Sequence, residues 1–290
     1  MDANYLNSLL TLLDDPDTEV YNAVSEKIIT QGISVIPVLE KVWENSENKL
    51  IQSRLENLIH SIQLSDVSSK LKNWINSPHQ DLLQGTLIVN QLQYPNLSVS
   101  NIEKAIDEIR KNAWLEINDN LTALEKVKVI NHVIYDVHKY SASISNFFAP
   151  ANHFLSQLVE TKKGGPIILS ILYAIVAQQL GLPVECVNLP KNFVLAYKDR
   201  YAISEQVSNE QNGILFYINP FSNGSVFGRM EIENFLKQQK IEDKAEYYLP
   251  CSNQKAIGQL VFNIIYSFER QHNKKKVEDF KKILTIIETI

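Results

Sequence analysis

Cysteine is scarce in this sequence: Cys186 and Cys251 are the only two among 290 residues. Two cysteines cannot build the disulfide framework that small secreted domains use to support a weak core. Long apolar runs are also missing, because the most apolar stretch, 166–177, contains Ser170 and is too short to span a bilayer. The first residues show neither the basic segment nor the apolar segment of a signal peptide. Together these features predict a cytoplasmic protein without a membrane partner.

Basic charge is in short supply as well. The chain has 28 Lys and Arg against 33 Asp and Glu, a formal net charge of -5. Surfaces that bind nucleic acid or anionic lipid usually carry a basic excess, so we expect neither partner. The short run at 274–276 is better interpreted as a solvated turn. Hydrophobic residues make up 44% of the chain, which is enough for a buried core in one large domain or two ordinary ones.

Residues 1–63 show the periodicity of short helices in antiparallel pairs. Apolar residues at 20, 24, 28 and 29 share one helical face, and Asp15-Pro16-Asp17 is typical of a helix start. Residues 12–20 and the helix after them resemble a HEAT-type repeat, although a generic helical hairpin explains them equally well. One or two such units are too few to stand alone, so we expect them to dock on the rest of the chain.

The helical pattern continues to residue 180. Candidate helices cover 50–62, 65–76, 81–93, 99–116, 121–140 and 152–160, separated by prolines 78, 95 and 150 and by the polar segment 118–120. The most apolar helix of the chain follows, at 167–180. Because it is hydrophobic on nearly every face, we expect it to be buried at the centre of the fold.

After this helix the periodicity changes to that of strands. Segments 184–189, 193–197 and 214–218 are short and rich in β-forming residues, 199–203 is a further candidate, and 204–213 is a polar loop. We therefore expect strands only within about 183–220. Helices are predicted again at 231–240, 254–271 and 275–290. This order predicts an α+β fold that is mostly helical, with a small antiparallel sheet packed on the central buried helix.

Four short motifs occur in an order and spacing that one bacterial family shares. They are NHFL at 152–155, KKGGPIILSILY at 162–173, GLPV at 181–184 and VNLP at 187–190. These segments resemble the SirB-type transglutaminase-like family, whose fold is that of the papain-like superfamily. The resemblance is clearest over residues 140–225. It implies a transglutaminase-like domain at 64–250 and a TPR-like helical pair at 251–290, which follow the HEAT-like helices at 1–63.

The resemblance implies a specific chemistry, which this sequence lacks. Enzymes of this fold place a Cys at the start of the buried helix, a His on the first strand and an Asp or Asn on the next, so that a thiolate attacks an amide. The matching positions are Pro166, Asn192 in PKNF and Asn219 in INPF. None of them is a nucleophile or a base. We therefore expect a pseudoenzyme, with these three residues facing one cleft.

Other residues offer weak substitutes for the missing catalytic groups. Cys186 lies in the first predicted strand, where burial would leave it inert; a hydrolase or transferase that uses it is the alternative hypothesis. Ser170 is interpreted as a hydroxyl that packs within the helix. The segment 164–166 is a helix start and lacks the spacing of a phosphate-binding loop. Since neither H-E-x-x-H nor C-x-x-C occurs, we expect no metal and no cofactor.

A binding function is the leading hypothesis from the sequence. Asn188, Asn192, Asn219 and Asn223 would line the cleft with neutral amides able to bond a peptide backbone, and the partner would be another protein or peptide. For Asn219 and Asn223 a simple role in turns is at least as good an explanation. A purely structural subunit is the third hypothesis.

Overall fold

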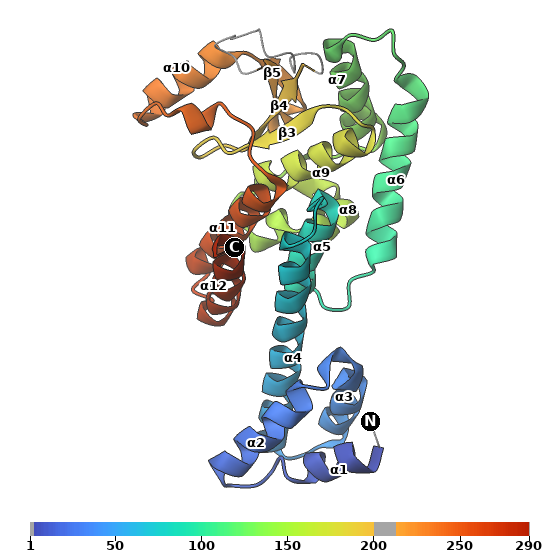
Figure 1. The fold of residues 1–290 in the computed structure, drawn as a ribbon, viewed down its shortest axis with the longest axis vertical. Coiled ribbons are helices and arrows are strands. Elements are labelled where there is room, and N and C mark those ends of the chain that lie inside the picture. The colour runs from blue at the N-terminus through green and yellow to red at the C-terminus, as the bar shows by residue number, and fades with distance from the viewer. Residues whose placement is uncertain (1–2, 200–212, 290) are drawn as a thin grey trace.

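The computed structural model describes residues 3–199 and 213–289 and shows an elongated, mostly helical molecule with a small sheet at one end (Figure 1). Helices α1 to α3 lie at the end opposite the sheet, and the long helix α4 joins the two parts. The expected α+β class is confirmed. The candidate strand at 199–203 and the loop at 204–213 lie outside the described residues, apart from Asp199 and Gly213.

The N-terminal helices have a core of their own. α1 (Ala3–Thr11), α2 (Thr18–Ile29) and α3 (Ile36–Asn45) pack on the first half of α4 (Lys49–Ile75) through residues such as Leu13, Ile28, Leu39 and Leu55. The Asp17 carboxylate caps α2 by accepting a hydrogen bond from the backbone N–H of Glu19 at 2.8 Å. The acidic helix start that the sequence predicts is therefore present.

α4 is one continuous helix, so the predicted break between residues 62 and 65 is wrong. Neither Gly nor Pro occurs near this point, and nothing else in the local sequence stops the helix. What changes there is the packing. Ile62 belongs to the N-terminal core, whereas Val67 is part of the main core, which includes α9. The boundary expected after residue 63 therefore falls inside a single helix, between two cores.

The next helices surround the centre of the fold. α5 (Leu82–Gln93) and α6 (Val99–Glu116) match the sequence expectation closely. The helix expected at 121–140 is shorter: α7 (Ala123–Asn131) passes into a π-helical turn (His132–Val137), whose His138 N–H bonds to Val133 C=O. The helix expected at 152–160 starts late, as α8 (Leu155–Thr161), because Phe154 is extended and follows a 3₁₀ turn at Pro150–His153.

α9 (Pro166–Gln179) is the central buried helix that the sequence predicts. Every residue from 167 to 177 is buried. α6, α8, α11 and strand β3 all pack against this helix, which explains why no face of it is polar. The Ser170 hydroxyl donates a hydrogen bond to the Phe193 carbonyl at 2.9 Å and joins the helix to the adjacent strand segment.

The sheet is an antiparallel meander in the order β3 (Val184–Val187), β4 (Val194–Lys198), β5 (Ile214–Asn219), β6 (Ser225–Phe227). Cys186 pairs with Leu195, and Leu195 pairs with Ile218 on its other side. The side chains of this row belong to the α9 side of the sheet. On the other face Ala196 and Tyr217 pack with Ile232 and Leu236 of α10 (Arg229–Gln239).

Strands are not confined to residues 183–220, as the sequence led us to expect. β6 lies beyond this range, because a tight turn at Asn223 and Gly224 returns the chain beside β5. A two-residue parallel pair, β1 (Ser141–Ala142) with β2 (Lys163–Gly164), forms where the segments before α8 and α9 meet. β6 pairs with the strand just before it across an Asn-Gly turn, whereas β1 and β2 come together from distant parts of the chain. All three are too short to show a strand pattern in the sequence.

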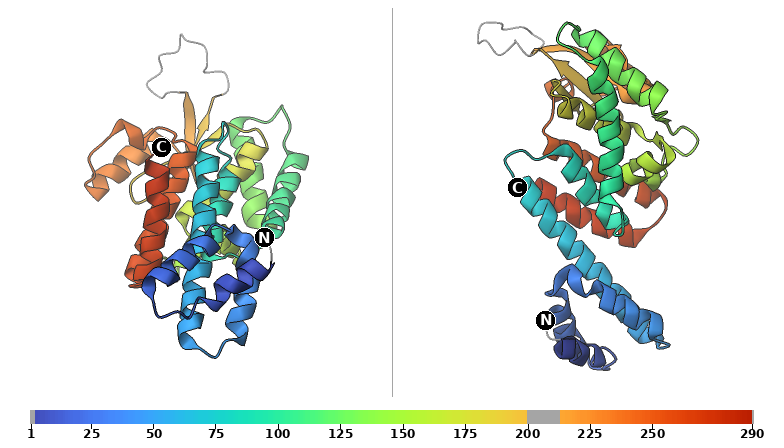
Figure 2. Two further views of the ribbon diagram at one scale, coloured as in Figure 1. Left: turned by 60° about the horizontal axis from the view of Figure 1, so that its bottom comes forward. Right: turned by 90° about the vertical axis from the view of Figure 1, so that its right-hand side faces the viewer.

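The two C-terminal helices, α11 (Asn253–Arg270) and α12 (Lys274–Glu288), form an antiparallel pair beside α4 and α5 (Figure 2). Their apolar residues, including Ile264 and Phe280, are part of the main core. His60 on α4 and the buried Asp279 on α12 are 2.8 Å apart (Nε2 to Oδ2). The pair is thus attached to both the domain centre and the long helix.

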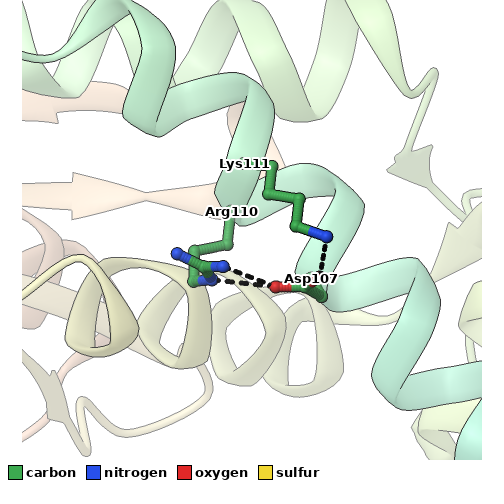
Figure 3. Close-up of polar contacts among 3 residues, drawn as sticks. All are labelled: Asp107, Arg110 and Lys111. Carbon is green, nitrogen blue, oxygen red and sulfur yellow. Dashed lines mark hydrogen bonds and ion pairs between the residues drawn. The ribbon is translucent and has the colours of Figure 1, made fainter.

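The solvent face of α6 carries a small charge cluster (Figure 3). Asp107 Oδ1 is 2.6 Å from the Arg110 guanidinium, and Asp107 Oδ2 is 2.6 Å from Lys111 Nζ. The hydrogen bonds from these two cations lower the pKa of Asp107. Such exposed pairs at helical spacing contribute little to stability.

Among the described helices, none is long and apolar enough to cross a membrane.

Candidate binding site

A cavity of about 330 Å³ opens at the N-terminal end of α9. Three parts of the chain form most of it: the start of α9, the turn between β3 and β4, and one face of α11. Its lining consists of Phe147, His153, Pro166, Ile167, Asn188, Leu189, Pro190, Lys191, Asn192, Phe193, Tyr247, Gln259, Phe262 and Asn263. No Asp or Glu is among these residues, and Lys191 is the only one with a permanent charge.

Pro166 occupies the first position of α9, where the missing N–H removes no helical hydrogen bond. The residue before it, Gly165, donates its backbone N–H to Asn152 C=O at 2.9 Å. A Cβ on Gly165 would lie 3.1 Å from that same oxygen, so the approach of these two segments favours glycine. The helix start is therefore fixed in place beside the cavity, which the Pro166 ring lines.

The turn between β3 and β4 supplies the polar groups opposite Pro166. Asn188 donates a side-chain N–H to Gln259 Oε1 at 3.2 Å and so joins the turn to α11. Asn192 is half-buried, and its amide makes no hydrogen bond to the part of the chain that the structure describes. Lys191 has a left-handed backbone with φ 61°. The structure therefore brings Pro166, Asn188 and Asn192 to one cavity.

Asn219 and Asn223 do not line this cavity, contrary to the expectation from the sequence. The Asn219 side chain is occupied in its own turn, where it accepts the Phe221 N–H at 3.1 Å and donates to Ser222 Oγ at 3.2 Å. Asn223 is an exposed turn residue with φ 51°, a conformation that asparagine tolerates well. The explanation by turn geometry is the correct one for both residues.

His153 is a lining residue that has no counterpart among the expected site residues. It is 6% exposed, its Nε2 lies 2.8 Å from Ser267 Oγ on α11, and its Nδ1 has no partner among the described residues. Burial lowers the pKa of His153 to about 4, so the ring is neutral near pH 7. The distance to Ser267 suits a nucleophile and base, but Ser267 is 1% exposed and does not line the cavity.

The cysteines are placed where they cannot serve the cavity. Cys186 is 1% exposed on the α9 side of the sheet, and burial raises the pKa of its thiol well above the ordinary value. Burial also raises the pKa of Cys251 to about 11. Both are free thiols, and neither lines the cavity. Within the described ranges, no group of three or more His, Cys, Asp or Glu is arranged to hold a metal ion.

A larger cavity, of about 630 Å³, lies elsewhere, between the loop after α5 and helices α6 and α8. Tyr94, Asn101 and Ser156 are among its lining residues, and none of the site residues expected from the sequence is. The smaller cavity is the better candidate site because it combines Pro166 and Asn192 with a buried, unpaired histidine nitrogen.

Sequence reasoning missed the contribution of α11, which provides Gln259, Phe262 and Asn263 to the cavity. These residues lie on a helix whose periodic pattern predicted only an amphipathic element. His153 was visible as a histidine just before the central helix, but no local signal distinguishes it from an ordinary buried residue. A periodic sequence identifies the apolar face of a helix and says little about which polar residue on its border meets a cavity.

Comparisons with known proteins find distant relatives. Human F-box only protein 21 is 22% identical over 238 residues, which is 74% of this chain and 37% of that protein. A UPF0162 protein from Vibrio cholerae is 22% identical over 160 residues (55% of each chain), and one from Xylella fastidiosa is 24% identical over 114 residues (39% of this chain and 41% of that protein). The chain thus spans little more than a third of the human relative. No solved structure gives a significant match.

A family model described as the transglutaminase-like superfamily matches residues 100–261. This range is more than half of the chain, and it contains α9, the sheet and the first half of α11. It therefore covers Pro166, Asn192 and most of the cavity lining. The chain belongs to the transglutaminase-like superfamily.

Proposed function

We propose that this chain is a non-catalytic member of the superfamily and that it binds a segment of another protein in the cavity at the start of α9. The observation that carries the proposal is the lining of this cavity, which includes Pro166 and Asn192, the two positions that the family resemblance assigns to a nucleophile and a base. A proline ring cannot attack a carbonyl, and a neutral amide cannot accept the proton of a thiol.

Catalysis by relocated residues is poorly supported by the geometry. The thiols of Cys186 and Cys251 have raised pKa values, so neither is activated as a thiolate. Ser267 and His153 are close together, but a substrate in the cavity would not reach the buried Ser267 hydroxyl. His153 Nδ1 also lacks the orienting acceptor that catalytic histidines usually have.

The same lining suits an extended peptide. Cavities of roughly 300–1,000 Å³ with apolar walls and a few convergent polar groups are typical of binding sites. Here Phe147, Ile167 and Phe262 provide apolar surface, while Asn192 and Asn263 offer amide donors and acceptors. A backbone peptide group carries the complementary acceptor and donor, which a neutral amide can bond without the desolvation cost of a charge.

Binding can be tested by filling the cavity. We expect peptides selected by phage display on the wild-type protein to bind it and to lose binding to Asn192→Trp, whose ring would occupy the cavity. Asn120→Trp is the matched control, because Asn120 is an exposed turn residue far from the lining in sequence and outside it. Equal binding by all three proteins would contradict the site, and selection of no peptide would favour the purely structural role.

Absence of catalysis has its own test. Amidase, protease and transglutaminase assays should show no turnover above background, and a fluorophosphonate probe should not label Ser267. Turnover that Cys186→Ala or Ser267→Ala abolishes would contradict the proposal and establish the hydrolase or transferase alternative.

Finer assignments extend this proposal. The motifs at 152–155 and 162–173, together with the bacterial UPF0162 relatives, support membership of the SirB-type group. The Asp17-capped α2 with α3 supports a HEAT-like N-terminal unit, and the antiparallel α11 and α12 support a TPR-like pair. Two free cysteines are compatible with the proposed cytoplasmic location.

A further inference from the structure

The charge of the cavity lining differs from that of the whole chain. The chain has a net charge of -5, yet the lining contains no Asp or Glu and includes the cation Lys191. Lys191 forms no ion pair with a described residue. Its Nζ donates to the neutral oxygen Oε1 of Gln239 at 3.0 Å, which leaves further N–H donors unused. An unpaired ammonium group beside a cavity without carboxylates favours an anionic ligand.

Lys191 has a left-handed backbone in the turn between β3 and β4. Its φ of 61° lies in the left-handed region, which glycine adopts freely and lysine does not. A glycine would therefore make this turn with less strain. Lysines 139, 162 and 240 share this conformation, so what distinguishes Lys191 is its place at the cavity.

Neutral polar groups lie further inside. The side-chain amide of Asn192 has no partner among the described residues. Asn263 donates a side-chain N–H to the Gln259 carbonyl at 2.8 Å, which leaves its Oδ1 available. His153 contributes a buried Nδ1 without a partner. These groups match the donor and acceptor pattern of a peptide backbone better than they match a second charge.

Exposed aromatic rings form the rim. Phe262 is 55% exposed and Phe147 38%, and because both line the cavity they present apolar surface at its edge. Phe147 contacts the rings of Phe148 and Phe221, with centroids 5.1 and 5.9 Å apart. The Arg270 guanidinium lies 4.1 Å from the Phe148 ring, so a second cation borders the same aromatic group.

We propose that the occupant is an extended peptide in which an apolar side chain stands close to a carboxylate; this rests on the peptide-binding function proposed above. The apolar side chain packs on Phe147 and Phe262, the backbone bonds to Asn192 and Asn263, and the carboxylate binds Lys191. An Asp or Glu side chain and a C-terminal carboxylate have the same chemistry, and the experiment separates them.

Four mixtures of synthetic fluorescent octapeptides serve as probes. Three are amidated, carry a central Phe, and differ only in having Glu, Gln or Lys two positions after it. The fourth carries Gln and a free C-terminal carboxylate. Fluorescence anisotropy should show the Glu or the free-acid mixture binding about tenfold more tightly than the amidated Gln mixture, with a smaller difference at high salt.

Two lysine variants provide the matched comparison. Lys191→Gly should abolish the preference for the carboxylate while raising the midpoint of urea unfolding, because the left-handed strain is relieved. Lys240→Gly is the control: Lys240 also has a left-handed backbone, with φ 55°, and it does not line the cavity. It should gain stability and keep the preference. The gain in stability excludes misfolding as the reason for lost binding.

The outcomes separate the two proposals. Equal binding of the Glu, free-acid and amidated Gln mixtures, or an unchanged preference in Lys191→Gly, would overturn the carboxylate selectivity and leave peptide binding intact. Binding of none of the four mixtures would overturn both. Tighter binding of the Lys mixture would show that Lys191 does not set the charge preference.

Discussion

Gly224 shows how strongly a single position can depend on a distant residue. Its backbone has φ 70°, and a Cβ there would overlap the side-chain amide of Asn131. That amide donates to the Gly224 carbonyl at 2.9 Å, and its Oδ1 accepts a hydrogen bond from the buried Tyr173 hydroxyl at 3.0 Å. The turn before β6 is thereby fixed to α7 and α9.

Gly224→Ala should therefore lower the free energy of unfolding by about 2–4 kcal/mol, through backbone strain and steric overlap. Gly32→Ala is the matched control, since Gly32 has φ 67° and nothing within 4 Å of the added Cβ. Only the strain applies there, so a loss of about 1 kcal/mol is expected in urea titration. Equal losses in the two variants would show that Asn131 yields without cost.

His153 should make stability depend on pH below neutrality. Its pKa is about 4 in the folded protein, whereas the unfolded chain has the ordinary value of 6.5. The unfolded state therefore takes up a proton first as the pH falls, and the stability contributed by the neutral ring is lost between about pH 6.5 and 4.

Between pH 7 and pH 5 we expect the wild-type protein to lose roughly 2 kcal/mol through this group alone. The change should be absent in His153→Gln, which keeps a neutral polar side chain beside Ser267. Urea titrations of both proteins at the two pH values give the comparison. A variant with the same pH dependence as the wild type would assign the effect to other groups.

At the scale of elements, α4 determines how the N-terminal helices are connected to the rest. The helix runs unbroken from Lys49 to Ile75, and its buried side chains change from the N-terminal core to the main core between Ile62 and Val67. The continuous backbone of α4 connects the two cores. The contact of His60 with Asp279 adds a non-covalent link between α4 and α12 near this junction.

A helix breaker at this junction should separate the two cores. Ser65 is exposed, so Ser65→Pro removes a backbone hydrogen bond and adds a clash at a cost of about 3 kcal/mol without disturbing buried side chains. We expect calorimetry to resolve an early transition of the N-terminal helices. Ser65→Ala, the control, should unfold like the wild type or slightly later. A single unshifted transition in Ser65→Pro would contradict the coupling.

The element order is largely predictable because each element has a local period. α5, α6, α9 and the two C-terminal helices follow apolar stripes, and β3 to β5 follow β-branched and aromatic runs. β6 and the pair of β1 and β2 are different. Their two or three residues become strands only because a partner strand lies beside them. The π-helical turn after Asn131 has no local signal in the sequence either.

At the scale of the whole molecule, the net charge predicts that the protein does not bind nucleic acid. With a net charge of -5 it has no basic excess to neutralise phosphates. Anisotropy of a fluorescent DNA duplex or RNA should therefore not change on addition of the protein at low salt. Binding that weakens steeply with added salt would reveal a basic surface and contradict this prediction.

The candidate site was partly foreseeable. The motif positions predicted that Pro166 and Asn192 occupy the places of catalytic groups, and both line the cavity, whereas Asn219 is used by its own turn. Short motifs fix the order of residues along the chain. They do not predict the direction of a side chain at the end of a strand. For Asn219 this direction is set by the hydrogen bond that its side chain accepts from the Phe221 N–H.

The α+β class, the buried central helix and the lack of a nucleophile at Pro166 can be predicted from the sequence, because they depend on local period and on the chemistry of single side chains. Which residues share the cavity depends on how the helices and the sheet pack together. His153, Lys191 and Phe262 are separated by tens of residues and meet because α11 packs against the domain centre. Such contacts depend on packing between segments that are distant in sequence, and the local periodicity of one segment does not identify the segment against which it packs.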